Sequence, residues 1–271
     1  MLLIDVGELA QKDKFTYEEM HKAFAGLYKL EYNPVAIKFF FDQEEYDNFE
    51  AEKVPGPKMT FCQMALASRM DDYIVKASED KLLCGNARTV FGYRKPSDEE
   101  VDTHVKYTNN WELAKKCMLS KPRLPRGELK GFMTAPLYKT PVEPDVVMFI
   151  INPFQAYHVL NDYIGAVKVS EVQSTHTVNS AVCGGSVRCY DEQKAGMNTM
   201  CAGSFTSGKT EKGEVNVFVP GKQIGLLAKQ LVERSHQYGG AASLLGSSGS
   251  EYPGIDVCKK CPMIRFKDYD K

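Results

Sequence analysis

One repeated feature limits how this chain can fold: in each half, a strongly apolar run precedes a helical segment that carries a cysteine. The runs are VAIKFFF at 35–41 and VVMFII at 146–151, and such β-branched and aromatic runs are typical of buried strands. A turn then leads to a second cysteine followed by Gly or Ala-Gly; the four cysteines are Cys62, Cys84, Cys183 and Cys201. We therefore expect an internal duplication in which segments 61–88 and 181–206 correspond to each other.

The order of these elements predicts the fold class. Strands alternate with helices in both halves, which is typical of an α/β (mixed α+β) architecture. We expect two similar αβ halves related by a pseudo-twofold axis, with a mixed sheet and flanking helices. Hairpin-like pairs, such as Tyr73–Ala77 with Lys81–Cys84, argue against a purely parallel doubly wound sheet.

We expect the two halves to form one compact domain. Its predicted parts are a helical segment at 1–33, a first half at 34–130, a second half at 131–240, and a flexible Gly/Ser loop with a cysteine-containing tail at 241–271.

Local signals mark several helix starts. The TYEE sequence at 16–19 is a capping box, Ser97 is an expected N-cap, and Pro153 suits the first position of a helix. Ser174 or Thr175 is expected to cap the helix that carries the first cysteine of the second half.

Two polar stretches raise the question of an anionic ligand. The basic, proline-containing stretch Lys115–Lys130 is interpreted as a solvated connection, with contact to an anion as the alternative. Gly203–Thr210 formally matches G-x-x-x-x-G-K-T, but the strand VNVFV at 215–219 follows it instead of a helix. We interpret this second stretch as a β-hairpin connection and not as a nucleotide-binding loop.

Composition excludes several classes of function. The chain has 271 residues and a net charge of −1, so nothing indicates nucleic acid or an anionic membrane as a partner. The start, MLLIDVGELAQKDKF, lacks the pattern of a signal peptide, and no run approaches the about 18 apolar residues of a membrane span. We expect a cytoplasmic protein whose eight cysteines are reduced and act more often as ligands or catalysts than as disulfides.

The number and repetition of the thiols predict a metal centre. Cys62, Cys84, Cys183 and Cys201 supply the four ligands that a [4Fe–4S] cluster or a structural zinc ion needs. The tail motif Cys258-x-x-Cys261 is a possible second or alternative metal site, or a redox dithiol.

Three further residues are candidates for a catalytic role. His176 precedes Cys183 by seven positions and would suit general acid–base chemistry near neutral pH. Arg88 and Arg188 hold corresponding positions in the two halves and could bind a carboxylate or phosphate, or simply pair with acidic side chains. For Cys117, on a polar segment, a packing role is expected.

A family resemblance rests on short motifs along 34–237, namely PVAIKF, Cys62, Cys84-Gly85 followed by Gly92, PFQAYHVL, Cys183 and Cys201-Ala202-Gly203-Ser204. On these motifs the chain resembles the prokaryotic domain of unknown function 169 (DUF169) family. It departs from the family at 84–87, where Cys-Gly-Asn-Ala replaces the Cys-Pro-Gly-Gly of many members. The resemblance implies the fold and the cysteine placement, cysteine-rich relatives in anaerobes, and no established reaction.

The leading hypothesis is therefore a [4Fe–4S] protein of an anaerobic or reducing cytoplasm. If all four cysteines are ligands, electron transfer or structural support is expected, whereas three ligands would leave an iron open for lyase chemistry. The alternatives are a zinc-stabilised small-molecule binding module and a thiol-redox protein that uses Cys258 and Cys261. Expected partners are a small-molecule substrate or a redox protein, and a homo-oligomer is possible.

Overall fold

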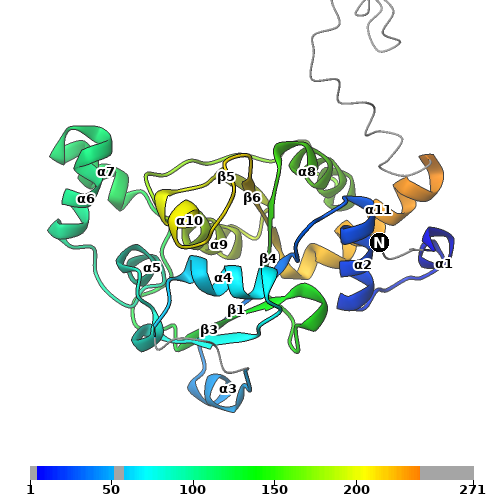
Figure 1. Ribbon diagram of the computed structural model, residues 1–271, viewed down its shortest axis with the longest axis horizontal. Coiled ribbons are helices and arrows are strands. Elements are labelled where there is room, and N and C mark those ends of the chain that lie inside the picture. Colours follow the sequence, from blue (N-terminus) through cyan, green and yellow to red (C-terminus); the bar gives the residue numbers. More distant parts are fainter. Residues whose placement is uncertain (1–4, 52–57, 239–271) are drawn as a thin grey trace, which may run out of the picture.

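The computed structural model describes residues 5–51 and 58–238 and is built on one six-stranded sheet (Figure 1). The strand order is β2-β3-β1-β4-β6-β5, and every neighbouring pair is antiparallel. The strands are β1 (Val35–Phe40), β2 (Val75–Ala77), β3 (Gly131–Pro136), β4 (Val146–Ile151), β5 (Gly196–Thr199) and β6 (Val215–Pro220).

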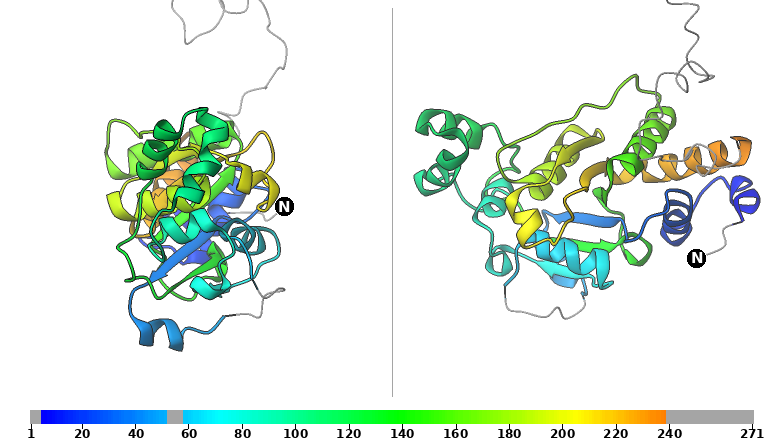
Figure 2. Two further views of the ribbon diagram at one scale, coloured as in Figure 1. Left: turned by 90° about the vertical axis from the view of Figure 1, so that its left-hand side faces the viewer. Right: turned by 45° about the horizontal axis from the view of Figure 1, so that its top comes forward.

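Helices cover both faces of the sheet (Figure 2). One face carries α4 (Phe61–Met70), α5 (Gly85–Val90), α9 (Ala181–Glu192) and α10 (Ala202–Thr206). The other carries α2 (Tyr17–Leu27), α8 (Pro153–Val167) and α11 (Ile224–Tyr238), and α1 (Val6–Ala10) packs on α11. None of the helices within 5–51 and 58–238 is long and apolar enough to cross a membrane.

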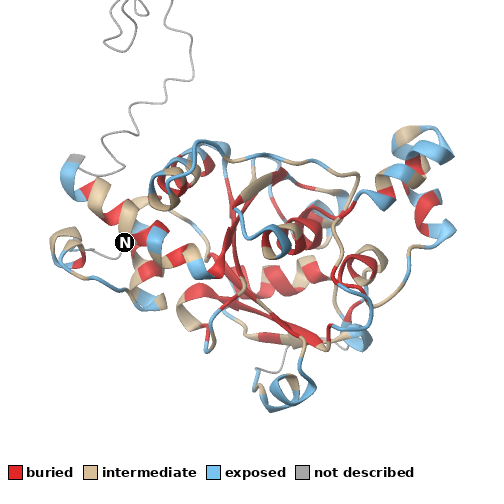
Figure 3. Cartoon of the chain, turned by 180° about the vertical axis from the view of Figure 1, so that it is seen from behind, coloured by how far each residue is buried: buried red, intermediate tan, exposed pale blue. Residues whose placement is uncertain are grey.

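Three helices lie outside these two layers. The helices α6 (Asp98–Thr108) and α7 (Trp111–Leu119) pack against each other and project from one end of the molecule (Figure 1). The short α3 (Gln43–Asn48) follows β1 and has no buried residue. Figure 3 shows that burial concentrates in the sheet and in the faces of the helices that contact it, while the α6–α7 hairpin is largely exposed.

Burial on both faces explains the continuous apolar runs that the sequence shows. In β4, Val146, Met148 and Ile150 pack with the α4–α5–α9 layer, while Val147, Phe149 and Ile151 pack with the α2–α8–α11 layer. An antiparallel strand usually alternates apolar and polar residues, but a strand between two helical layers does not need to. The two cores account for most of the large buried side chains in the described residues.

The predicted α+β class is confirmed, and the structure corrects its details. The sheet is antiparallel throughout instead of mixed. The predicted strand Lys81–Cys84 is wrong: Glu79–Lys81 is a 3-10 turn, and Leu82 forms only an isolated bridge to Met59. The strand that pairs with β2 is β3. The sequence did not indicate this strand, because it is short, begins with glycine, ends with proline and has few β-branched residues.

The strand order bears on the predicted repeat. Strands β1, β2 and β3 occupy one side of the sheet and β4, β5 and β6 the other, in the orders β2-β3-β1 and β4-β6-β5. The two sides meet at β1 and β4, where Val35 lies opposite Met148 and Ile37 opposite Val146. A twofold axis between β1 and β4 would produce this order by exchanging β1 with β4, β3 with β6 and β2 with β5. That the two halves share one structure stays a prediction.

The helix starts agree with most of the predicted signals. Thr16 and Ser97 each form a complete capping box, and Pro153 begins α8 after the N-cap Asn152. The cap predicted at Ser174 or Thr175 is wrong, because α9 begins only at Ala181. The residues before it run along the edge of β5, where the Thr175 N–H donates to the Met197 carbonyl over 3.0 Å.

The two polar stretches also have different outcomes. Lys115–Leu119 belongs to α7, so only the part after Ser120 is the connection that was predicted for the whole stretch. The connection between β5 and β6 is confirmed as a β-hairpin connection, with the short α10 inserted in it. The tail at 241–271, with Cys258 and Cys261, lies outside the described residues.

Candidate functional site

Four cysteines lie at or next to the starts of four helices. Cys62 is the second residue of α4 and Cys183 the third of α9, while Cys84 and Cys201 are the N-caps of α5 and α10. Burial raises the pKa of the Cys62 thiol well above its usual range, and the thiols of Cys201, Cys183 and Cys84 raise this pKa further. The structure therefore brings together the four thiols that the repeat predicted, and all four are free.

The backbone around α4 holds the two cysteines of the first half near each other. Thr60 caps α4: its hydroxyl accepts from the Gln63 N–H over 3.1 Å, and the Gln63 side chain accepts from the Thr60 N–H over 2.9 Å. The residue before this cap, Met59, donates to the Lys81 carbonyl over 3.0 Å and accepts from the Leu83 N–H over 2.8 Å. This pairing fixes the chain that leads into Cys84 against the chain that leads into Cys62.

Buried amides position the corresponding part of the second half. Asn198, on β5, donates to the carbonyl of Ala181 at the start of α9 over 2.9 Å. Its side-chain oxygen accepts from Asn216 on β6 over 2.8 Å. Because β5 leads within two residues to Cys201, these bonds tie the helix start that carries Cys183 to the strand that delivers Cys201.

Ser204 and Gly208 join the two halves at the thiols. The buried Ser204 hydroxyl lies 3.4 Å from Cys201 Sγ and also hydrogen-bonds the Cys62 thiol, which moderates the pKa of Cys62. A Cβ at Gly208 would lie 3.1 Å from the Cys62 Cβ and 2.8 Å from the Ser204 carbonyl. A glycine is therefore needed here so that the β5–β6 connection can approach α4.

Lys121 is a buried residue at this site that the sequence analysis did not identify. Its side chain is only 5 % exposed, and its ammonium donates to Asn86 Oδ1 over 2.9 Å. Burial lowers the pKa of Lys121 to about 8, whereas Cys183, Glu100 and Cys201 act to raise it. The interpretation of this stretch as solvated is therefore wrong at Lys121, whose cation acts electrostatically on the thiols.

His104, on α6, holds the Lys121 ammonium from the other side. The ammonium lies 2.6 Å from His104 Nε2, and His104 Nδ1 lies 2.6 Å from the Glu100 carbonyl oxygen. A carbonyl only accepts and an ammonium only donates, so Nδ1 carries the proton and Nε2 accepts from Lys121. Burial lowers the pKa of His104, and the Lys121 charge lowers it further.

The predicted catalytic residues each have a partner of their own. His176 is exposed, and its Nδ1 lies 2.7 Å from Thr199 Oγ1. Arg88 donates through Nε to the Leu82 carbonyl over 2.7 Å, and Arg188 pairs with Glu192 over 3.0 Å. The two arginines line separate cavities, so they do not form one anion site.

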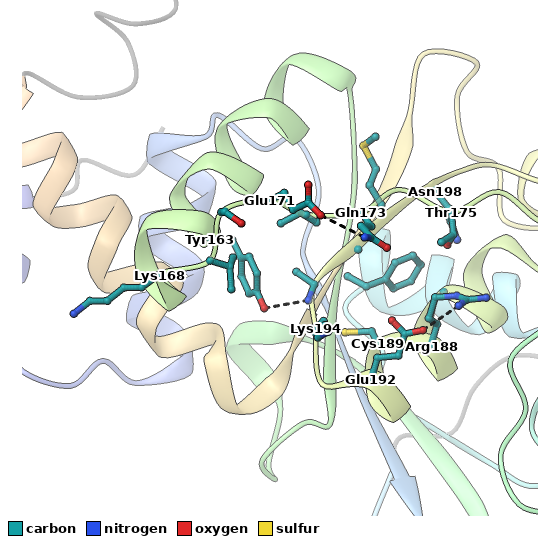
Figure 4. A pocket seen from close by; sticks show the side chains of 18 residues that line it. Tyr163, Lys168, Glu171, Gln173, Thr175, Arg188, Cys189, Glu192, Lys194 and Asn198 are labelled. Carbon is teal, nitrogen blue, oxygen red and sulfur yellow. Dashed lines mark hydrogen bonds and ion pairs between the residues drawn. The ribbon is translucent and has the colours of Figure 1, made fainter.

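One candidate ligand cavity lies beside α9 (Figure 4). It has a volume of about 590 Å³ and lies between segment 168–175, β5 and the α9 face that carries Gly185, Arg188 and Cys189. Helical periodicity places Cys183 on the opposite face of α9. The cavity is therefore distinct from the place where the thiols gather.

Comparison with known proteins assigns no reaction. A family model, DUF169, described as "Uncharacterised ArCR", matches residues 23–230. No curated protein and no solved structure matches the chain.

Proposed function

Because the chain belongs to the DUF169 family, whose description assigns no reaction, we propose a function from the site itself. The protein binds a [4Fe–4S] cluster through Cys62, Cys84, Cys183 and Cys201 and uses it for electron transfer. The observation that carries this proposal is the convergence of four free thiols from four helix starts. When bound, a cluster of this type supplies one-electron redox chemistry.

The protonation of the thiols sets a condition on any group that they bind. Burial raises the pKa of Cys62 and of Cys183, and the neighbouring thiols raise both further. Four thiolates at neutral pH are therefore unfavourable unless positive charge is placed among them. Iron supplies that charge, so binding would release the thiol protons and stabilise the fold.

A zinc ion is the alternative occupant of the four thiols. A [4Fe–4S] cluster and a structural zinc ion both take four cysteine ligands. The side chains of 5–51 and 58–238 form no group of three or more His, Cys, Asp or Glu residues that could hold a metal ion. Metal analysis of the purified protein therefore decides between the two occupants.

The number of thiols favours electron transfer over lyase chemistry. Four cysteine ligands would leave no iron free for a substrate oxygen, and the cavity beside α9 does not include the four thiols in its lining. The partner would then be a redox protein, with a small-molecule substrate as the alternative. We also propose a reducing cytoplasm as the location, because the six cysteines of the described part of the chain are free thiols.

Anaerobic purification followed by iron and sulfide analysis tests the proposal, and α9 offers a matched pair of variants. Cys183→Ser removes a proposed ligand, whereas Cys189→Ser changes a buried cysteine of the same helix that lines the cavity beside α9. We expect about four irons and four sulfides per chain in the wild type. Cys183→Ser should lose most of this iron, and Cys189→Ser should retain it.

Two results would contradict the proposal. One is a colourless wild-type protein without iron or sulfide, and one equivalent of zinc in it would support the zinc module instead. The other is a protein that loses its iron when Cys258 and Cys261 are changed to serine but keeps it in Cys183→Ser. That result would place the metal site in the C-terminal tail.

A further inference from the structure

A buried cation lies near the start of α5, and its hydrogen-bond partners among the described residues are neutral side chains. Lys121 donates to Asn86 Oδ1 over 2.9 Å and to His104 Nε2 over 2.6 Å. The nearby carboxylate of Glu100 is bound by the Thr89 hydroxyl and by Arg94 over 2.8–2.9 Å, and it acts on Lys121 only through space. The charge of Lys121 is therefore not neutralised by a direct ion pair with Glu100.

The two partners fix where the ammonium can lie. Asn86 is the second residue of α5, directly after Cys84 and Gly85, so one hydrogen bond ties Lys121 to the helix start that carries a predicted ligand. The other bond comes from His104 on α6, whose ring is held by the Glu100 carbonyl. An ammonium has three N–H donors, and these two bonds use two of them. The third has no hydrogen-bond partner among the residues that the structure describes.

Burying a lysine in this way is unfavourable unless an anion compensates it. Cys183 and Cys201 are the groups outside this network whose negative charge would compensate Lys121 once their thiol protons are released. A cluster with four thiolate ligands carries net negative charge, which one buried ammonium would offset in part.

We propose that Lys121, positioned by His104 and Asn86, is the counter-charge of the group held by the four cysteines and raises its reduction potential. This inference rests on the proposed [4Fe–4S] cluster. Reduction adds one electron to the group, and a fixed positive charge nearby stabilises the reduced form more than the oxidised form. Hydrogen bonds to the sulfurs and burial are the other means by which a protein sets such a potential.

An anaerobic redox titration followed by EPR tests the inference on the full-length protein. The variants are Lys121→Met, which removes the charge and the donors, and Lys121→Gln, which removes the charge but keeps a donor. The control is Lys116→Met, which removes an exposed lysine of α7. At the potential where the wild type is half reduced, we expect both Lys121 variants to have a reduced-to-oxidised ratio about tenfold lower, a shift of about 59 mV for a one-electron couple. Lys116→Met should stay within about twofold of the wild type.

The possible outcomes separate this inference from the proposed function. If the wild type holds no iron, the cluster proposal fails and takes the inference with it. If the wild type and either Lys121 variant hold equal iron and their reduced-to-oxidised ratios agree within twofold, the inference alone is overturned. If Lys121→Met does not fold, the reduced-to-oxidised ratio of Lys121→Gln is compared with that of the wild type, because this variant keeps a polar group in the site.

Discussion

In protein prepared without metal, the burial of Lys121 predicts that Lys121→Met is more stable than the wild type at neutral pH and less stable at high pH. Burial lowers the pKa of Lys121 from 10.5 to about 8, so keeping it protonated in the folded state is unfavourable by about 3 kcal/mol at neutral pH. Lys121→Met removes this penalty and also removes two hydrogen bonds, which together are worth about 2 kcal/mol. The variant should then be more stable than the wild type by about 1 kcal/mol at pH 7.

The dependence on pH follows from proton binding. Between pH 8 and 10.5 the unfolded lysine binds more protons than the folded one, so the stability of the wild type rises relative to the variant across this window. By pH 10.5 the wild type should be more stable by about 2 kcal/mol, the worth of the hydrogen bonds. Titration of the thiols affects both proteins and largely cancels in the difference.

Urea unfolding under reducing, anaerobic conditions at several pH values from 7 to 10.5 measures this difference. Lys116→Met is the matched control, because the lysine that it removes is exposed and should give a difference that does not vary with pH. A difference for Lys121→Met that stays constant over the whole range would refute the reasoning that Lys121 is buried as a cation.

Three other substitutions test the packing of the fold and a fourth serves as a control, all by urea or thermal unfolding. Asp162→Asn removes the buried carboxylate that accepts from Arg234 Nη2 over 2.8 Å, and it should lower the free energy of unfolding by about 3–5 kcal/mol. A decrease below about 1 kcal/mol would contradict a buried ion pair. Gly221→Ala places a Cβ 1.7 Å from a backbone carbonyl oxygen and should destabilise the protein by about 3 kcal/mol. The control Gly213→Ala places a Cβ where no atom lies within 4 Å and should leave the stability unchanged. Equal effects of the two substitutions would contradict the close packing of Gly221. Thr60→Ala removes the cap of α4 and should lower stability by about 1 kcal/mol, so an unchanged midpoint would argue against the cap.

Much of the fold could be predicted from the sequence where the signals are local. The run at 146–151 identified β4, and the proline at Pro153 identified the start of α8. The capping box at 16–19 identified α2. In contrast, β3 has weak strand propensity of its own and is a strand because β1 and β2 pair with it on both sides.

The candidate site divides in the same way. The repeated sequence pattern was sufficient to group four cysteines, because the four helix starts that carry them lie on one face of the sheet. Lys121 could not be found from its neighbours, since its partners lie 17 and 35 positions away in the chain. His176 was placed near the thiols on the assumption that α9 begins close to it, and α9 begins five residues later.

Mössbauer spectroscopy of protein that is produced with isotope-enriched iron and purified anaerobically reports the ligands of every iron. We expect one [4Fe–4S] cluster per chain in which all iron sites have tetrahedral sulfur ligation, lost in Cys183→Ser and kept in Cys189→Ser. A spectrum without cluster iron, or one in which an iron site lacks a sulfur ligand from the protein, would contradict a centre held by Cys62, Cys84, Cys183 and Cys201.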